Sequence, residues 1–431
     1  MKRMEDDRMI KHILKMIWAQ RRSNIWIFGE LMIVVCALWF MVDKMWVDYR
    51  CYYAPMGYDI TNTWQFKLTW LSAKAPGYQP QAKKIDQAET LSKLMEHIRL
   101  ETEVEDVAVA FYSMPYSWGN SWMAYYPVDG DTVTCKNKSL HVLRVSPEYF
   151  DIFRIQDKEG RSVTQVLNET SLHDPMVITE EGEKSLFFGE SAVGRELSTS
   201  PKMTEKYPIV AVLSTFRSYD FDPPENCVFE VLKGQSFNET VEDFGAESAE
   251  LVIRTKRPMT RKEMYAFLEK NADRFTVNNL FVQGVKQLTS QRMDMLTGKL
   301  NKQKKDLSLA VFLLVNVFLG VVGTFWLRTE KRRGEIGLRM ALGSDRFTMG
   351  KLMFSEGLIF LALTFPFLLF FVFNMGLTDL VDTYREPLSL LRYVGTMGIV
   401  YVIMALMICL GIYFPTSKAM RMQPAEALHY E

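Results

Sequence analysis

The stretch LSLAVFLLVNVFLGVVGTFWL, residues 307–327, decides the fold of this protein. It contains no charged side chain, and about 20 apolar residues in a helix span a hydrocarbon core about 30 Å thick. Three further stretches have a similar length and composition, at about residues 25–42, 352–377 and 393–414. The sequence therefore predicts an integral membrane protein with four transmembrane helices.

Lysine and arginine are concentrated in two of the segments that flank these stretches, residues 1–22 and 328–351. The segment 378–391 instead holds more acidic than basic side chains near its start. Positively charged loops are retained in the cytoplasm. We therefore expect both termini and residues 328–351 to be cytoplasmic, and the long region of about 46–305 to lie outside.

The region 46–305 mixes strand and helix patterns. β-rich runs occupy residues 107–112, 139–145, 175–179, 207–213 and 250–255, and helical patterns occupy about 88–100 and 261–272. This mixture predicts an α+β domain. The whole chain has 51 basic and 51 acidic residues, so it lacks the basic excess of a nucleic-acid-binding protein.

The end of this region, about residues 286–305, has few helix breakers. Met293, Leu296 and Leu300 are spaced by three and four residues, which is typical of one helical face. The pattern continues into the apolar stretch without a proline. It predicts a stalk helix that is continuous with the second transmembrane helix, residues 306–327.

Residues 1–23 predict a cytoplasmic amphipathic helix. Its apolar face consists of Met9, Ile10, Ile13, Leu14, Ile17 and Trp18, and basic residues flank that face. Such a helix lies in the headgroup layer of a membrane. An ordinary solvated N-terminus is the alternative. The first transmembrane helix would follow at 24–45.

The sequence contains none of the common catalytic motifs. GxxxxGK[ST], HExxH, GxSxG and CxxC are all absent, and the five histidines are far apart. We therefore expect no catalytic residue and no metal site. Of the five cysteines, Cys51, Cys135 and Cys227 fall in the outer region, which allows at most one intrachain disulfide.

Three polar residues interrupt the apolar stretches: Glu30, Glu356 and Asn316. Both glutamates lie near the basic cytoplasmic segments, where pairing with a cation lowers the cost of a carboxylate. A structural role is favoured over a proton relay, which is the alternative. Asn316 is interpreted as a residue that hydrogen-bonds between helices.

Residues 328–351 are charged yet carry an apolar stripe. Ile336 and Met340 are four residues apart, as are Leu338 and Leu342, and Gly343 suits a helix C-terminus. This pattern predicts a short cytoplasmic helix that docks on a partner. A helix that lies on the lipid headgroups would also fit.

The sequence EKRRGEIGLRMALGSDR, residues 330–346, resembles the cytoplasmic loop of the FtsX-like permeases, the membrane subunits of MacB-type ABC transporters. The ending PTSKAMRMQPAEALHYE, residues 415–431, and the stretches VSPEYFDIF, 145–153, and ITEEGEKSLFFGESAVGREL, 178–197, are also similar to that family. The matching positions of the loop are Glu335, Ile336, Gly337, Leu338, Arg339, Ala341, Leu342 and Gly343.

The resemblance implies an architecture for the whole chain. The outer region would be a MacB-like periplasmic core, with a porter-like part and an inserted sabre-like part at about 126–235. Residues 328–351 would hold the coupling helix. Transmembrane helices three and four would occupy 352–377 and 392–414, joined by an outer loop at 378–391, and 415–431 would be a cytoplasmic tail.

The resemblance also implies a function. The chain would be a non-catalytic permease subunit in the bacterial cytoplasmic (inner) membrane. It would couple ATP hydrolysis by a separate cytosolic ABC ATPase to movements of the outer domain, for export or extraction of a periplasmic or membrane-associated substrate. ATP and Mg would be bound by that ATPase, and this chain would hold no cofactor.

The partners implied are a second copy or a related permease, the ATPase and the lipid bilayer, with a periplasmic adaptor and an outer-membrane channel as further candidates. Two alternatives stay open. One is a signalling subunit that regulates an envelope enzyme such as a cell-wall hydrolase. The other is a lipoprotein-release permease.

Overall fold

The structure is a computed structural model of the 431-residue chain. It describes residues 15, 18–19, 21–117, 119, 121–128, 138–170, 172–331, 334 and 346–421. The chain forms two compact units, Tyr53–Lys299 and the combination of Met1–Tyr52 with Leu300–Glu431. The predicted amphipathic helix at 1–23 lies largely outside the described residues.

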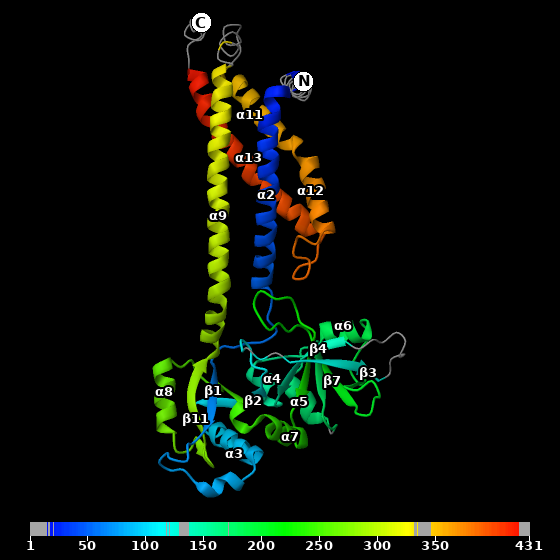
Figure 1. Cartoon of the computed structure of the whole chain (residues 1–431), viewed down its shortest axis with the longest axis vertical. Helices are drawn as coiled ribbons and strands as arrows, with labels where there is room; N and C mark the ends of the chain where they lie inside the picture. Colours follow the sequence, from blue (N-terminus) through cyan, green and yellow to red (C-terminus); the bar gives the residue numbers. More distant parts are fainter. Residues whose placement is uncertain are drawn as a thin grey trace. The chain divides into compact units, whose positions relative to one another are not determined.

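The unit Tyr53–Lys299 is built on an 11-stranded sheet with the order β10-β11-β1-β9-β2-β4-β3-β6-β7-β5-β8 (Figure 1). Most neighbours are antiparallel, whereas β4–β8 and β5–β7 are parallel. The strands are β1 Thr63–Trp70, β2 Val104–Phe111, β3 Trp122–Pro127, β4 Lys138–Val145, β5 Met176–Thr179, β6 Glu196–Ser198, β7 Tyr207–Leu213, β8 Cys227–Val231, β9 Glu250–Thr255, β10 Thr276–Val277 and β11 Leu280–Gln287.

Helices connect these strands and cover the sheet. They are α3 Gln87–Arg99, α4 Glu148–Ile152, α5 Val163–Glu169, α6 Glu180–Phe187, α7 Gln235–Phe244 and α8 Arg261–Lys270, with 3-10 turns η1 Pro80–Lys84 and η2 Ala246–Ser248. Polar side chains begin several of them: Asp86 caps α3, Ser162 caps α5, Thr179 caps α6 and Thr260 caps α8. The α+β prediction for this region is confirmed at this level.

Strand β2 lies in the middle of the core because both of its faces are covered. Ala108 and Ala110 belong to one apolar cluster, together with the aromatic residues of α4. Val107 and Val109 belong to another cluster, together with Leu91 and Leu94 of α3. Successive side chains of a strand point to opposite faces, so an uninterrupted apolar run such as VAVAF fits a strand that is buried on both sides.

The segment 126–235, which the resemblance suggested as an insertion, contributes strands to the same sheet. β4 lies within this segment and pairs with β2 outside it, with Ala110 opposite Val145. The predicted stalk, by contrast, was placed slightly too early. Lys286 and Gln287 pair with Gln65 and Trp64 of β1, so helix α9, Leu288–Lys331, begins only where this pairing ends.

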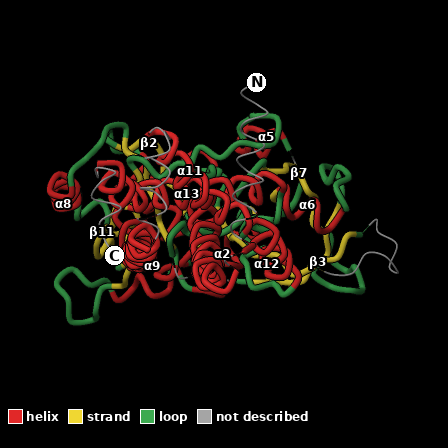
Figure 2. The backbone as a smooth tube through the Cα atoms, turned by 90° about the horizontal axis from the view of Figure 1, so that it is seen from above, coloured by secondary structure: helices red, strands yellow, loops and turns green. Residues whose placement is uncertain are grey.

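The second unit is helical. Its elements are α2 Arg21–Tyr53, the part of α9 from Leu300, α11 Arg346–Leu363, α12 Phe365–Leu377 and α13 Leu390–Arg421. Four stretches of the described residues are long and apolar enough to cross a membrane: Ile25–Tyr53, Leu288–Thr324, Gly350–Leu377 and Leu390–Tyr413. Seen end-on in Figure 2, α2 lies between α9 and α12.

The third apolar stretch, predicted as one helix at 352–377, is two helices that meet at Thr364. Pro366 has no N–H for the carbonyl four residues earlier, and its ring clashes with that carbonyl. The Thr364 hydroxyl donates to the Leu361 carbonyl at 2.6 Å and so satisfies one of the acceptors at the break.

Gly57, just after α2, occupies a position that only glycine fits. Its φ is +85°, and an added Cβ would overlap the carbonyl of Thr215. Gly77 has a similar φ of +82° but open space around it. We expect Gly57→Ala to be less stable than Gly77→Ala by about 1–3 kcal/mol, because both lose the left-handed freedom of glycine but only Gly57→Ala adds a clash.

Parallel thermal melts of the two variants of the full chain in detergent measure this difference. Equal melting temperatures would contradict the assigned backbone conformation.

Candidate functional site

The predicted ATPase-coupling residues, Glu335, Ile336, Gly337, Leu338, Arg339, Ala341, Leu342 and Gly343, lie outside the described residues. Their role therefore stays a prediction. The described part of the helical unit offers a different feature, a group of paired charges around one buried ion pair where α2 meets the start of α13. We call this group the charged clamp: Asp43, Asp48 and Arg50 of α2, with Asp382, Arg385, Glu386 and Arg392.

Arg392 and Asp43 form the centre of the charged clamp. Their exposed fractions are 1% and 3%. The guanidinium Nε and Nη2 donate to the two carboxylate oxygens at 2.8 and 2.6 Å, a bidentate pair. Nη1 donates to the carbonyls of Asp382 and Glu386. Because every guanidinium nitrogen is bonded, the burial of this cation is compensated.

Arg385 extends the charged clamp into the segment between α12 and α13. It donates to Asp48 at 2.7 Å and to Asp382 at 2.5 Å. Partial burial alone raises the pKa of Asp382, but the hydrogen bonds from the Arg385 backbone N–H and guanidinium outweigh it, and the pKa lies below its ordinary value. Asp382 therefore stays ionised and paired over a wide pH range.

Helices α2 and α13 also make close neutral contacts. The Trp39 indole donates to the Thr396 hydroxyl at 3.0 Å, and both residues are buried. A Cβ at Gly395 would lie 2.9 Å from the Trp46 ring, so glycine is what lets the helices approach. Together with the charged clamp, these contacts hold α2 and α13 in one arrangement.

Helix α9 is bound much less closely to its neighbours in this unit. Much of its apolar surface is exposed, for example Phe312 at 62% and Leu319 at 61%. Contacts with α2 include the ion pair of Lys44 with Asp306 and the close approach of the Glu30 carboxylate to Gly320, where a Cβ would overlap it. These contacts place α9 beside α2 without burying it.

The three predicted intramembrane residues have different environments. Glu30 is half-buried against α9, and Glu356 of α11 is only 4% exposed. Asn316 is exposed, and its carboxamide donates to the Phe312 carbonyl four residues earlier in the same helix at 2.8 Å. This bond stays within one helix, so the role of Asn316 between two helices remains a prediction.

The first turns of α9 are anchored within the unit Tyr53–Lys299. Arg292 pairs with Asp220, whose side chain is fully buried, and Lys299 lies 3.4 Å from Asp222. Both acids belong to the segment 214–226 between β7 and β8. Arg217 of the same segment donates to the carbonyls of Ala54 and Asp222 at 2.9 and 2.8 Å. The segment thus contacts both the base of α9 and the residues that follow α2.

Comparison with known proteins identifies the C-terminal part of the chain. Residues 307–424 match the family model described as FtsX-like permease C-terminal. This part of the chain is an FtsX-like permease C-terminal domain. It contains the apolar part of α9, the helices α11–α13 and the four members of the charged clamp that lie outside α2, Asp382, Arg385, Glu386 and Arg392. No curated protein matches the chain.

Solved structures resemble about half of the chain at low identity. The periplasmic region of MacB from Actinobacillus actinomycetemcomitans is 13% identical, with a TM-score of 0.32, over 56% of this chain and 94% of that one. A domain of a permease protein from Porphyromonas gingivalis is 13% identical, with a TM-score of 0.33, over 52% of this chain and 90% of that one. The extracellular domain of the ABC-type transporter YknZ from Gram-positive bacteria is 12% identical, with a TM-score of 0.29, over 51% of this chain and 100% of that one.

Sequence reasoning missed the charged clamp and the anchor of α9. Asp43 and Arg392 do stand at the ends of apolar stretches, and a pair of opposite charges at such ends is a usable signal. The Arg292–Asp220 pair left no such signal. Its members are 72 residues apart and each is surrounded by ordinary polar sequence.

Asp43→Asn tests the charged clamp. It leaves a buried guanidinium without its counter-charge, so we expect a loss of about 3–5 kcal/mol in stability. Asp306→Asn is the matched control, because the Lys44–Asp306 pair is 40% and 38% exposed and contributes about 0–1 kcal/mol. Adding Arg392→Gln to Asp43→Asn should restore part of the loss. Thermal melts of the full chain in detergent measure all three variants against the unmodified chain, and equal effects of the two single Asn variants would refute the ranking.

Proposed function

We propose that this chain is a permease subunit that transmits ATP-driven movement between the cytoplasm and an outer domain. The observation that carries the proposal is α9, one uninterrupted helix of 44 residues from the end of β11 to Lys331. At 1.5 Å per residue it is about 66 Å long, roughly twice the thickness of a hydrocarbon core. A helix of this length reaches well beyond the membrane and can carry a displacement along its axis.

The packing of the helical unit supports α9 as the moving part. Helices α2, α11, α12 and α13 share one buried apolar cluster, and α9 contributes no buried member to it among the described residues. Only Leu314 of α9 packs against its edge. Moving α9 along α2 would therefore disrupt fewer buried contacts than moving any helix of that cluster.

The pairing of Arg292 with Asp220 would connect α9 to the outer domain. A push or pull on the helix would reach the segment 214–226 through Arg292 and Asp220, and from there the sheet strands β7 and β8. The predicted coupling helix at 328–351 would receive the movement from a separate cytosolic ABC ATPase, which binds ATP and Mg. This chain itself would be non-catalytic.

The exposed apolar face of α9 supports assembly with a second permease chain, identical or related. In a bilayer this face would contact either lipid or another helix, and a second copy would place two α9 helices between two packed clusters. We place the chain in a bacterial inner membrane with both termini cytoplasmic. The cargo would be a periplasmic or membrane-associated substrate. Capture of a cell-wall hydrolase by the outer domain would instead favour the signalling alternative.

A proline in the exposed part of α9 tests the transmission. Lys302→Pro removes one backbone hydrogen bond and bends the helix without touching packed side chains, since Lys302 is exposed. We expect transport to fall at least about tenfold while the ATPase subunit still co-purifies. Lys302→Ala, which keeps the helix straight, is the matched control and should behave as the unmodified chain. Full transport by the proline variant would rule out transmission through α9.

Ile336→Asp tests whether the apolar stripe of the predicted coupling helix binds the ATPase. A charge on the apolar side of the predicted coupling helix should abolish co-purification of the ATPase, because the carboxylate would be desolvated in the interface. Arg333→Asp places the same residue on the polar side and serves as a control with a weaker expected effect. Retention of the ATPase by Ile336→Asp would show that the stripe faces something else.

A further inference from the structure

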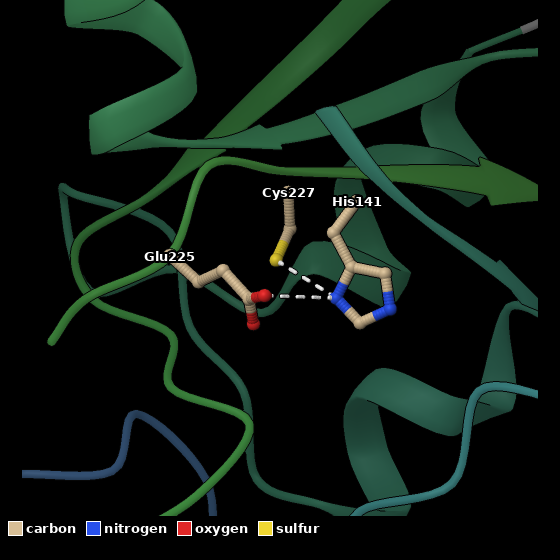
Figure 3. A group of neighbouring side chains, drawn as sticks. All are labelled: His141, Glu225 and Cys227. Carbon is tan, nitrogen blue, oxygen red and sulfur yellow. Dashed lines mark hydrogen bonds and ion pairs between the residues drawn. The ribbon is translucent and has the colours of Figure 1, made fainter. Parts of the chain in front are cut away.

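Three side chains with metal-binding atoms converge at the start of β8, where the segment 214–226 joins this strand. They are His141 of β4, Cys227 of β8 and Glu225 just before β8. Figure 3 shows the Glu225 carboxylate and the Cys227 thiol directed at the same ring nitrogen of His141. We propose that His141, Glu225 and Cys227 bind a zinc ion.

The distances suit coordination. His141 Nδ1 lies 3.3 Å from Glu225 Oε1 and 3.9 Å from Cys227 Sγ, and the three atoms all lie within 4.8 Å of one another. Zinc bonds are about 2.0–2.3 Å long, so the ligand atoms of a tetrahedral site stand roughly 3–4 Å apart. A small inward movement of the thiol completes this spacing. The mixture of imidazole, carboxylate and thiolate is one that zinc accepts.

The backbone fixes two of the ligands before any metal binds. β4 and β8 are parallel neighbours, and His141 stands directly opposite Cys227 in their register. Glu225 precedes Cys227 by two residues, a spacing that returns a side chain to the same face in extended chain. The site thus follows from the strand pairing, and it could not be seen in a sequence where His141 and Cys227 are 86 residues apart.

Surrounding groups hold the ligands in place. The Thr179 hydroxyl accepts from Cys227 N at 3.0 Å and donates to the Glu225 carbonyl at 2.7 Å, which ties the two backbones together. The Ser218 hydroxyl donates to the second oxygen of Glu225. The Trp122 ring stacks on His141 with an interplanar angle of 17°. Such outer contacts orient ligands in metal sites.

A small cavity lies next to one of the three proposed ligands, His141. A cavity of about 20 Å³ borders His141 and Ser218, together with Ser117 and Tyr219. A cavity above roughly 10–15 Å³ holds one water molecule. Three protein ligands and one water make a four-coordinate site, and binding would release the thiol proton of Cys227 to solvent.

Two other uses of the same residues fit less well. Cys227 and Glu225 both face Nδ1 of His141, so the histidine cannot relay a proton from a nucleophilic thiol to the carboxylate through its two nitrogens. Cys227 is fully buried, out of reach of a substrate. The Cys227 thiol is not part of a disulfide. The sequence analysis expected no metal site, and the proposed zinc site replaces that expectation.

A bound zinc would brace the segment 214–226, since Glu225 ends this segment and Asp220 within it holds Arg292. This consequence rests on the proposed transmission through α9, whereas zinc binding itself does not. The test therefore reads out the metal and not transport.

Purified full-length chain in detergent is dialysed against Zn²⁺, and bound metal is measured by elemental analysis, with Co²⁺ as a spectroscopic probe. We expect one Zn²⁺ per chain and a thiolate-to-cobalt charge-transfer band. Both should be lost in Cys227→Ser and in His141→Gln. Cys51→Ser and His97→Gln, which alter a buried cysteine and a half-buried histidine outside the group, should keep both.

Ser218→Ala keeps all three ligands and removes only the hydroxyl that holds Glu225, so it guards against variants that fail to fold. It should weaken Zn²⁺ binding about 10–100-fold. Absence of stoichiometric zinc in the unmodified chain would overturn the proposal. So would a cobalt band that survives in Cys227→Ser, or unchanged affinity in Ser218→Ala.

Discussion

The hydrogen-bonding requirement of a backbone in hydrocarbon governs the helical half of this protein. Water is absent from the bilayer core, so each N–H and C=O there must find a partner within the chain. The apolar part of α9, residues 307–327, meets this requirement because a helix pairs its backbone groups internally. At the break before Pro366, the Leu361 carbonyl accepts from both the N–H and the hydroxyl of Thr364.

The same requirement, applied to charge, explains how the remaining helices are held together. A buried guanidinium costs several kcal/mol unless it is fully paired, and Arg392 is paired by a carboxylate and two carbonyls. Such a cluster has one low-energy geometry, because a shift of α2 against α13 would leave charges unpaired. The ion pair between α9 and α2, Lys44 with Asp306, is instead exposed to solvent. An exposed ion pair can be broken at a cost of only about 0–1 kcal/mol.

The strand-rich unit shows a related division between fixed and connecting parts. β2 is buried on both faces and cannot move without opening two apolar clusters. The segment 214–226 instead lies between strands and carries much of the polar anchoring, through Arg217, Asp220 and Glu225. A movement of α9 would meet this segment first. The proposed zinc site lies at its far end, where the segment joins β8.

The sequence by itself determined the elements whose cause is local. Length and hydropathy specified four apolar helices, alternation and β-branching specified strands such as β2 and β9, and the lack of breakers specified the long helix ahead of residue 307. The start of α9 was misjudged by two residues, because strand pairing with Trp64 and Gln65 competes with helix formation and is invisible in a local pattern.

Tertiary structure alone decided which polar residues meet. Asp43 and Arg392 are 349 residues apart, and His141 and Cys227 are 86 apart. The residues next to each member in the sequence do not indicate its partner. Helix packing brings Asp43 to Arg392, and the register of β4 and β8 brings His141 to Cys227. Local propensity acts over a few residues, whereas electrostatic pairing and coordination act through space once the fold has brought the groups together.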